Sequence, residues 1–159
     1  MKPPGGFTST ALDAYEPALA LNLLSVVAMC KAAVPAMQER GWGRVVAITS
    51  IAVRQPIETL ILSNTARTGA TGFLKSVARE VARDGVTVNS VLPGLHDTDR
   101  LRGLYGGGDP SGLAAGIPAG VIGRPEDFGA VVAFLCSDAA RFITGAAIPV
   151  DGGTDRALL

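Results

Sequence analysis

Histidine and cysteine are scarce in this chain, and their scarcity excludes most metal chemistry. The only histidine is His96, and the two cysteines, Cys30 and Cys136, lie far apart in apolar stretches. A single imidazole cannot form a cluster of ligands, and no cysteine or histidine spacing matches a zinc site. We expect no bound metal, and we expect both cysteines to be reduced thiols, as is usual in cytoplasmic proteins.

An excess of charge of either sign is also missing. Fourteen basic and fourteen acidic residues cancel, and the pI calculated from the sequence is about 6.6. A chain without net charge has no electrostatic reason to bind nucleic acid or an anionic membrane surface. We therefore expect neither as a partner.

The chain has no uninterrupted apolar run long enough to span a membrane. Its most apolar stretch, residues 18–37, contains Asn22, Lys31 and Pro35, and this pattern predicts a buried helix. The first ten residues, MKPPGGFTST, lack the apolar core of a secretory signal. We expect a cytoplasmic protein without a membrane partner.

What is present is an alternation of helical and strand patterns in a chain of one-domain length, 159 residues with 48% hydrophobic content. Helices are predicted at about 10–40, 64–83 and 125–139, and buried strands at 44–50, 86–94 and 145–153. This order is typical of the α/β class, a parallel sheet with helices on both faces.

Two segments of this pattern give more detailed predictions. Residues 95–122 are rich in glycine, proline and charge, which favours a mobile loop or lid over core structure. In the second helix, apolar residues at three-to-four spacing predict the stripe that faces the core. These residues are Ala66, Ala70, Phe73, Val77 and Val81.

Several motifs in order resemble the short-chain dehydrogenase/reductase family, in particular its branch similar to 3-ketoacyl-acyl-carrier-protein reductases. The motifs are ALNLLSVV around Asn22, GRVVAITS ending at Ser50, GFLKSVAREVARDG, VTVNSVLPG, GRPEDFGAVVAFLCSDAARFITG and IPVDGG. The resemblance covers the chain from about residue 7. It implies a Rossmann-like doubly wound sheet, NAD or NADP as cofactor, and a small carbonyl or alcohol substrate.

Two motifs of that family are missing. The sequence contains neither the glycine-rich turn TGxxxGxG that holds the dinucleotide nor the NNAG segment that follows the family's fourth strand. We therefore expect residues 1–159 to form one partial domain of three strands. It would lack the N-terminal half that binds adenosine and pyrophosphate.

The resemblance also implies the site residues. The family uses an Asn, a Ser, a Tyr and a Lys, and Asn22 and Ser50 match the first two. The Tyr and Lys positions hold Ser63 and Arg67, and no Tyr-x-x-x-Lys occurs anywhere in the chain. The position of Arg67 implies a contact with the cofactor ribose. The turn Pro93–Gly94 would lie beside the nicotinamide, with Thr98 contacting its carboxamide.

The two replacements change what the site can do. A phenol with an ordinary pKa near 10 can be tuned toward neutrality, whereas an aliphatic hydroxyl such as that of Ser63 titrates far higher. Arg67 stays charged and suits an anion or a ribose, but it does not shuttle protons. The candidate replacement acids are His96, Asp97 and Tyr105, each of which also reads as an ordinary loop residue.

Each residue implied by the family also has a purely structural interpretation. Asn22 can bond the preceding helical turn, Ser63 can cap the second helix, and Arg67 can be a surface or ion-pairing residue. Three functional hypotheses follow. The chain is a divergent NAD(P)-dependent oxidoreductase, a non-catalytic binding or assembly protein with the same fold, or an incomplete product of a longer enzyme.

Assembly is predicted from the same resemblance. In the family, the helices corresponding to 11–40 and 63–83 form a four-helix bundle with a second subunit. The family's strand order also leaves strand 44–50 without its neighbour, and an open apolar edge invites pairing. We expect a homodimer or larger homo-oligomer, with strand 44–50 covered by a partner or by the N-terminal lead-in.

Overall fold

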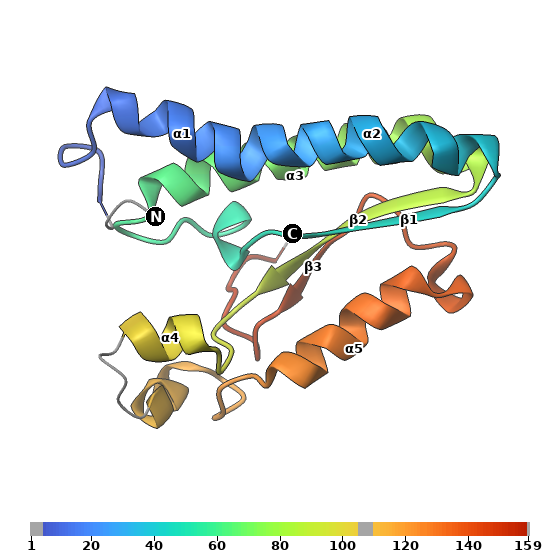
Figure 1. Ribbon diagram of the computed structural model, residues 1–159. Helices are drawn as coiled ribbons and strands as arrows, with labels where there is room; N and C mark the ends of the chain where they lie inside the picture. The colour runs from blue at the N-terminus through green and yellow to red at the C-terminus, as the bar shows by residue number, and fades with distance from the viewer. Residues whose placement is uncertain (1–4, 105–109, 159) are drawn as a thin grey trace.

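A computed structural model describes residues 5–104 and 110–158 and shows a three-stranded parallel sheet flanked by helices (Figure 1). The strands are β1 (Gly43–Ile48), β2 (Val86–Pro93) and β3 (Ala147–Val150), in the spatial order β1-β2-β3. The helices are α1 (Tyr15–Leu19), α2 (Ser25–Glu39), α3 (Ile61–Val81), α4 (Asp99–Leu104) and α5 (Pro125–Cys136). The α/β class and the parallel three-stranded sheet are confirmed.

The central strand β2 holds the sheet together. Gly43 pairs with Val86 at the start of β1, and Ser90 pairs with Ala147 at the start of β3. Every residue of β2 except the last is buried, which suits its run of β-branched and apolar side chains. The carboxyl ends of β1 and β2 consequently lie at the same edge of the sheet.

Helices cover both faces of the sheet, as Figure 1 shows with α2 and α3 above it and α5 below. Val45 and Ala47 of β1 face a core cluster with α2 and α3, whereas Val46 faces a second cluster with α5. This alternation is the two-residue period of a strand. Pro125 begins α5 as its first residue, where the missing N–H costs nothing.

The core stripe of α3 differs in part from the prediction. Ala66, Ala70 and Val81 are buried as predicted, but Leu74 and Ala78 complete the buried set. Phe73 and Val77 are only partly buried and pack at the side of the α2–α3 cluster. The reason is that α3 packs against the sheet on one face and α2 on another, so its apolar surface is wider than one stripe.

The first helix runs from Leu12 to Glu39 and is interrupted neither at Pro17 nor at Pro35. The irregularity is a π-helical turn at Ala20–Leu24. Pro17 lies in the first turn of α1, where its N–H is not needed. The expected burial of this helix is wrong for this chain, since its buried residues are Ala14, Cys30 and Val34.

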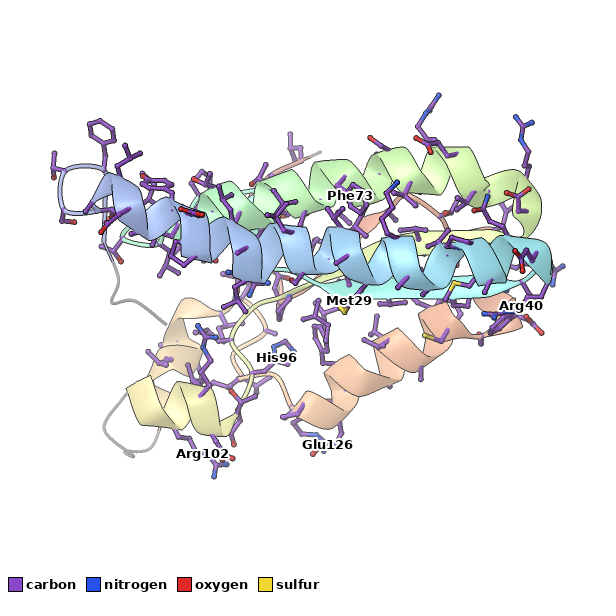
Figure 2. All side chains as sticks on the ribbon, turned by 45° about the horizontal axis from the view of Figure 1, so that its top comes forward. Met29, Arg40, Phe73, His96, Arg102 and Glu126 are labelled. Carbon is purple, nitrogen blue, oxygen red and sulfur yellow. The ribbon has the colours of Figure 1, made fainter. Side chains whose placement is uncertain are left out.

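Much of the apolar surface of this first helix is therefore exposed, including Leu21, Leu24 and Met29, the last of which is labelled in Figure 2. By length and composition alone, Leu12–Glu39 is long and apolar enough to cross a membrane. Core helices of globular proteins meet the same criterion, so this finding does not by itself indicate a membrane segment.

The prediction that residues 95–122 form a loop or lid without core structure is wrong in part. This region contains α4 and the 3-10 helix Pro110–Gly116, and it buries Leu101 and Ile117. Residues 105–109 lie outside the described part. These short helices were not predicted from the sequence because each contains too few apolar residues to produce a periodic pattern, and the glycine and proline content favoured a loop.

The N-terminal lead-in does not cover strand β1 within the described residues. Gly5 forms an isolated parallel bridge with Leu60, donating its N–H to Thr59 O and accepting from Ile61 N–H. The free edge of β1 carries Ile48, which is 58% exposed. The prediction that the N-terminal lead-in covers strand 44–50 is therefore wrong for the described residues. Its cover by a partner chain stays a prediction.

Candidate functional site

Ser50 follows β1 directly, at the carboxyl edge where open α/β sheets place their ligands. Its backbone is extended, and its Oγ accepts a hydrogen bond of 3.1 Å from the Ala52 N–H. This bond caps the 3-10 helix Ile51–Val53. Because the hydroxyl oxygen acts as the acceptor there, the hydroxyl proton remains available to donate to another group.

Arg67 lies on α3 and is tied to the end of β1. Its Nη1 donates to Ile48 O at 3.2 Å and to Thr49 O at 3.0 Å. The parallel register would bring the backbone nitrogen of residue 93 to Thr49 O, but Pro93 has no N–H. Arg67 thus satisfies a carbonyl that the sheet ladder leaves open.

The electrostatics of Arg67 follow from this half-buried position. Desolvation by burial, and then the nearby guanidinium of Arg100, lower the pKa of Arg67. An arginine starts so far above neutrality that it stays protonated regardless. Within the described residues, its Nη2 and Nε have no acceptor, so these donors can serve an anion or a hydroxyl.

Ser63 and Asn22 lie on elements that pack together. Ser63 is in the first turn of α3, whose N-cap is Leu60, so the interpretation of Ser63 as the helix cap is wrong. Asn22 lies in the π-helical turn, which packs on α3, and its Nδ2 donates to Ala18 O at 3.0 Å. The bond to the preceding turn expected from sequence is present, and π-bulges occur often at functional sites.

Gly94 and Thr98 follow the end of β2. A methyl group at Gly94 would lie 2.7 Å from Asp151 Cα, so this position requires glycine for close approach to the C-terminal turn. Thr98 Oγ1 accepts from the Leu101 N–H at 3.3 Å and so supports the first turn of α4. Thr98 has a structural contact, and its hydroxyl proton remains free to donate.

The candidate replacement acids are mostly engaged elsewhere. His96 stacks edge-on against Phe128 at 5.1 Å, and its Nδ1 lies 3.3 Å from Gly94 O (Figure 2). Asp97 accepts two bonds of 2.8 Å from Arg102, and these hydrogen bonds lower the pKa of its carboxyl group. Asp97 is therefore ionised at neutral pH and cannot donate a proton. Tyr105 lies outside the described residues.

Sequence reasoning missed a group of polar contacts beside Ser50. Arg54 Nε lies 3.1 Å from Asp155 Oδ2, and Gln55 Oε1 accepts from the Arg156 N–H at 3.2 Å. These contacts join the Ser50 loop to residues that follow β3. The only signal for them in the sequence is that both segments follow predicted strands and must share one edge of the sheet.

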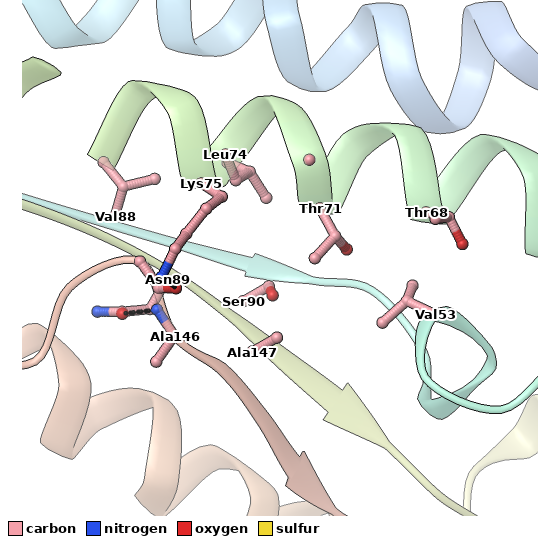
Figure 3. Close-up of a pocket in the computed structure, with 12 residues that line it drawn as sticks. Val53, Thr68, Thr71, Leu74, Lys75, Val88, Asn89, Ser90, Ala146 and Ala147 are labelled. Atoms are coloured by element: carbon pink, nitrogen blue, oxygen red, sulfur yellow. Dashed lines mark hydrogen bonds between the residues drawn. The ribbon is translucent and has the colours of Figure 1, made fainter. Parts of the chain in front are cut away.

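A cavity of about 310 Å³ lies between α3 and the strands β2 and β3 (Figure 3). Its polar lining includes Thr68, Thr71 and Lys75 from α3, and Ser90 from β2. Lys75 Nζ donates to Gly145 O at 2.7 Å and partly closes the cavity end. None of the predicted site residues lines this cavity, although Val53 of the 3-10 helix after Ser50 does.

Comparison with known proteins identifies relatives of the same kind throughout. A family model described as enoyl-(acyl carrier protein) reductase matches residues 1–155. The 3-oxoacyl-[acyl-carrier-protein] reductase FabG of Salmonella typhimurium is 38% identical over 141 residues, covering 89% of this chain and 57% of that protein. The dehydrogenase/reductase SDR family member 4 of Bos taurus is 34% identical over 153 residues, covering 94% and 54%. The chain thus spans little more than half the length of these relatives.

Solved structures give the same result. An NADPH-bound short chain oxidoreductase from Pseudomonas aeruginosa PAO1, described as containing an atypical catalytic center, superposes with a TM-score of 0.90 at 28% identity, over 99% of this chain and 63% of that one. The TT0495 protein from Thermus thermophilus superposes with a TM-score of 0.85 at 32% identity, over 97% and 66%. By sequence and by fold, the chain belongs to the short-chain dehydrogenase/reductase family.

Proposed function

We propose that this chain forms the carbonyl-binding part of an NAD(P)-dependent oxidoreductase whose acid–base step is weakened. The observation that carries the proposal is the state of the edge at Ser50. Ser50 keeps a hydroxyl proton free to donate, while Ser63 and Arg67 occupy the positions where the family has its Tyr and Lys. Such an edge can hold a carbonyl or alcohol oxygen but has lost the family's proton donor.

The chemistry of the four predicted catalytic residues supports separate roles. Ser50 and Ser63 would hydrogen-bond the substrate oxygen. Arg67, tied by Nη1 to the strand carbonyls, would present its remaining donors to the ribose or to an anionic group. Asn22, oriented by its bond to Ala18 O within the same helix, would lie in the π-helical turn that packs on α3. Proton transfer at neutral pH lacks a group with a suitable pKa among these four residues.

The residues of this chain suit the nicotinamide end of a dinucleotide better than its pyrophosphate and adenosine. Thr98 has a hydroxyl proton to donate and lies shortly after the turn Pro93–Gly94, so by the resemblance these three residues would lie beside a nicotinamide and its carboxamide. A bound dinucleotide would supply the hydride. The sequence contains no glycine-rich turn leading into a helix N-terminus, which is the usual holder of the pyrophosphate.

We therefore expect this chain by itself to bind NADH or NADPH weakly or not at all. Isothermal titration calorimetry of the 159-residue chain with each cofactor tests this expectation. The result should be no saturable heat at concentrations where intact family members bind. Tight binding at one cofactor per chain would show that another part of the molecule holds the pyrophosphate.

The catalytic proposal is tested in a chimera that joins this chain to the N-terminal half of the FabG relative from Salmonella typhimurium. NADPH oxidation with a 3-oxoacyl substrate should be slow. The double change Ser63→Tyr with Arg67→Lys should raise it on the order of 10²- to 10⁴-fold, because it restores a positioned acid. Ser50→Ala in the restored chimera should lower it again. Equal turnover with and without the double change would mean that another residue is the acid.

A non-catalytic binding or assembly protein is the second candidate. The observation that favours it is that Arg67 already serves the backbone of β1, so its charge need not reflect chemistry. A folded chimera with no NADPH oxidation in either form would favour this candidate. We also propose that the protein is cytoplasmic and forms a homo-oligomer through the helices on the α2–α3 side.

A further inference from the structure

We propose that the C-terminal segment, residues 151–156, positions Ser50, and that the ion pair between Arg54 and Asp155 is the contact that locks it in place. The meaning of this role for catalysis rests on the proposed function. The structural role itself does not, and it can be tested without any turnover.

The C-terminal segment has a conformation of its own. The Asp151 carboxylate accepts from the Gly153 N–H at 2.9 Å and from the Asp155 N–H at 2.6 Å, one oxygen for each. Gly152 and Gly153 have φ values of 65° and 85°, which glycine adopts without strain. The segment is therefore a tight turn held by a carboxylate, starting where β3 ends.

Three connections of the carboxyl edge meet on this segment. The connection after β2 contacts it at Gly94, where the backbone approaches Asp151. The connection before α5 contacts it through the Ala119 N–H, which donates to Gly152 O at 3.0 Å. The connection after β1 contacts it through Arg54 and Gln55. The segment 151–156 thus contacts all three connections.

The contact of Arg54 and Gln55 with the C-terminal segment fixes the position of the loop that holds Ser50. Arg54 caps the 3-10 helix Ile51–Val53, and the Ala52 N–H of that helix donates to Ser50 Oγ. Movement of Arg54 therefore moves the donor that orients the Ser50 hydroxyl. Arg54 and Gln55 grip the segment at two adjacent points, which resists rotation of the loop as well as displacement.

Burial distinguishes this ion pair from the others. The Asp155 side chain is 6% exposed and that of Arg54 is 22% exposed. The Asp97–Arg102 pair is shorter, at 2.8 Å, but its side chains are 38% and 54% exposed. Exposed pairs contribute little, whereas removing one partner of a buried pair leaves an uncompensated charge. Loss of the Arg54–Asp155 pair should therefore affect stability more than loss of the Asp97–Arg102 pair, although the Arg54–Asp155 distance is longer.

The experiment is amide hydrogen exchange of the full chain, followed residue by residue by NMR. In Arg54→Met and in Asp155→Asn, the Ala52 amide should exchange faster, on the order of tenfold or more, because its acceptor loses its fixed position. The amides of Val88 and Val91 in β2 should keep their protection. Arg54→Lys, which retains the charge, should recover much of the protection at Ala52.

Asp97→Asn is the matched control, because it removes a carboxylate from an arginine on the same edge without touching the segment. It should leave Ala52 unchanged. Unchanged exchange at Ala52 in both single variants would overturn the proposal. So would equal acceleration at Val88 and Val91, since the pair would then stabilise the whole fold and not the loop.

If the single variants do not fold, Arg54→Met combined with Asp155→Leu removes both charges and leaves no unpaired ion. Faster exchange at Ala52 in that folded double variant supports the proposal, and wild-type exchange rejects it. Failure of the chimera to oxidise NADPH both with and without the double change would reject the proposed function and leave this result standing.

Discussion

At the scale of single residues, the edge at Ser50 depends on two positions with special backbones. Pro93 lacks an N–H, so Thr49 O is left to Arg67. Gly94 lacks a side chain, so the C-terminal segment can lie directly against it. Both residues belong to the motif VTVNSVLPG, and both were assigned to a cofactor contact by resemblance. The structure adds a packing reason for each, and their role toward a cofactor remains a prediction.

Gly94→Ala should destabilise the protein by about 1–3 kcal/mol, because the new methyl would overlap Asp151 backbone and side-chain atoms. Urea unfolding followed by circular dichroism measures the change. Gly129→Ala is the control, since Gly129 is exposed within α5 and a methyl there meets no atom within 4 Å. It should stabilise the protein by about 0.5–1 kcal/mol. Equal effects at the two positions would contradict the close-approach argument.

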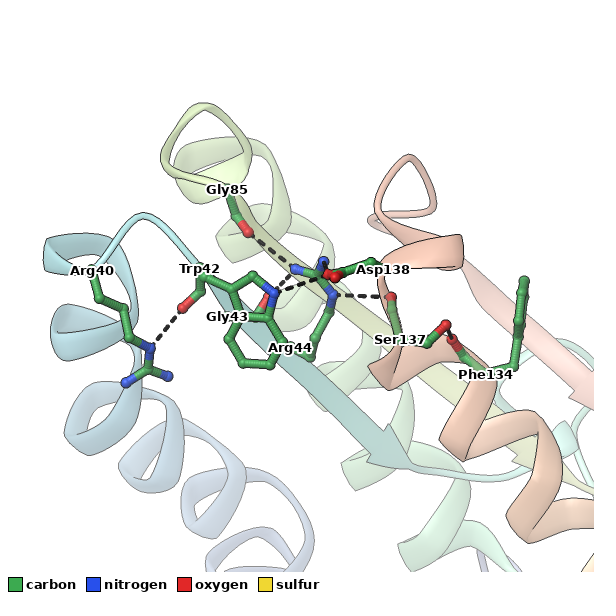
Figure 4. Close-up of polar contacts among 8 residues, drawn as sticks. All are labelled: Arg40, Trp42, Gly43, Arg44, Gly85, Phe134, Ser137 and Asp138. Atoms are coloured by element: carbon green, nitrogen blue, oxygen red, sulfur yellow. Dashed lines mark hydrogen bonds and ion pairs between the residues drawn. The ribbon is translucent and has the colours of Figure 1, made fainter.

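At the scale of elements, the amino ends of the strands are tied together by one arginine (Figure 4). Arg44 on β1 has a side chain only 5% exposed, and it donates to Gly85 O before β2 and to Ser137 O after α5. It also pairs with Asp138 at 3.2 Å and lies over the ring of Trp42. This side chain therefore connects β1 to the turn before β2 and to the end of α5.

Arg44→Met should lower the free energy of unfolding by about 2–3 kcal/mol, because it leaves several carbonyls without a donor. Arg40→Met is the control. Arg40 is exposed, makes one bond of 2.8 Å to Trp42 O, and lies 5.9 Å from the Trp42 ring. Its loss should cost less than about 1 kcal/mol. If chemical denaturation ranks the two variants equally, Arg44 is not the connecting residue.

At the scale of the whole molecule, the chain exposes more apolar surface than its sheet and helices can bury. The first helix presents Leu21, Leu24 and Met29 to solvent, and the free edge of β1 presents Ile48. Apolar surface gathered on one side marks an interaction surface. The helix layer is also where relatives of the family pair, by the resemblance given above.

We expect the chain to form a homodimer or larger oligomer through α2 and α3. Light scattering at low micromolar concentration should give a mass above the 16.2 kDa of one chain. Leu24→Glu and Met29→Glu should weaken association, because these side chains are 57% and 63% exposed and are not part of the chain's own core. Phe73 and Val77 are poorer test positions, since both pack against the α2–α3 cluster.

Val121→Glu is the control for this prediction, because Val121 is 62% exposed but lies before α5, away from the helix layer. It should leave the mass unchanged. A stable monomer of the unaltered chain would contradict the prediction. So would association that survives both charged changes in a chain that stays folded.

The sequence by itself determined the α/β class, the order of the six main elements and the family. These follow from local periodicity and from motifs, both of which are carried by neighbouring residues. The predicted core stripe of α3 omitted Leu74 and Ala78 and included the partly buried Phe73 and Val77, because a helix covered on two sides has no single stripe. It also missed α4, because a short helix has too few turns to show a period.

Only the tertiary structure decided which groups meet at the carboxyl edge. Arg67 meets Thr49 O because the parallel register places Pro93 opposite that carbonyl. Arg54 meets Asp155 although the two lie far apart in the sequence, because β1 and β3 end at the same edge of the sheet. Pairings of this kind depend on strand register and side-chain burial. Strand register and side-chain burial cannot be predicted from the local pattern of residues, so only the three-dimensional structure shows these contacts.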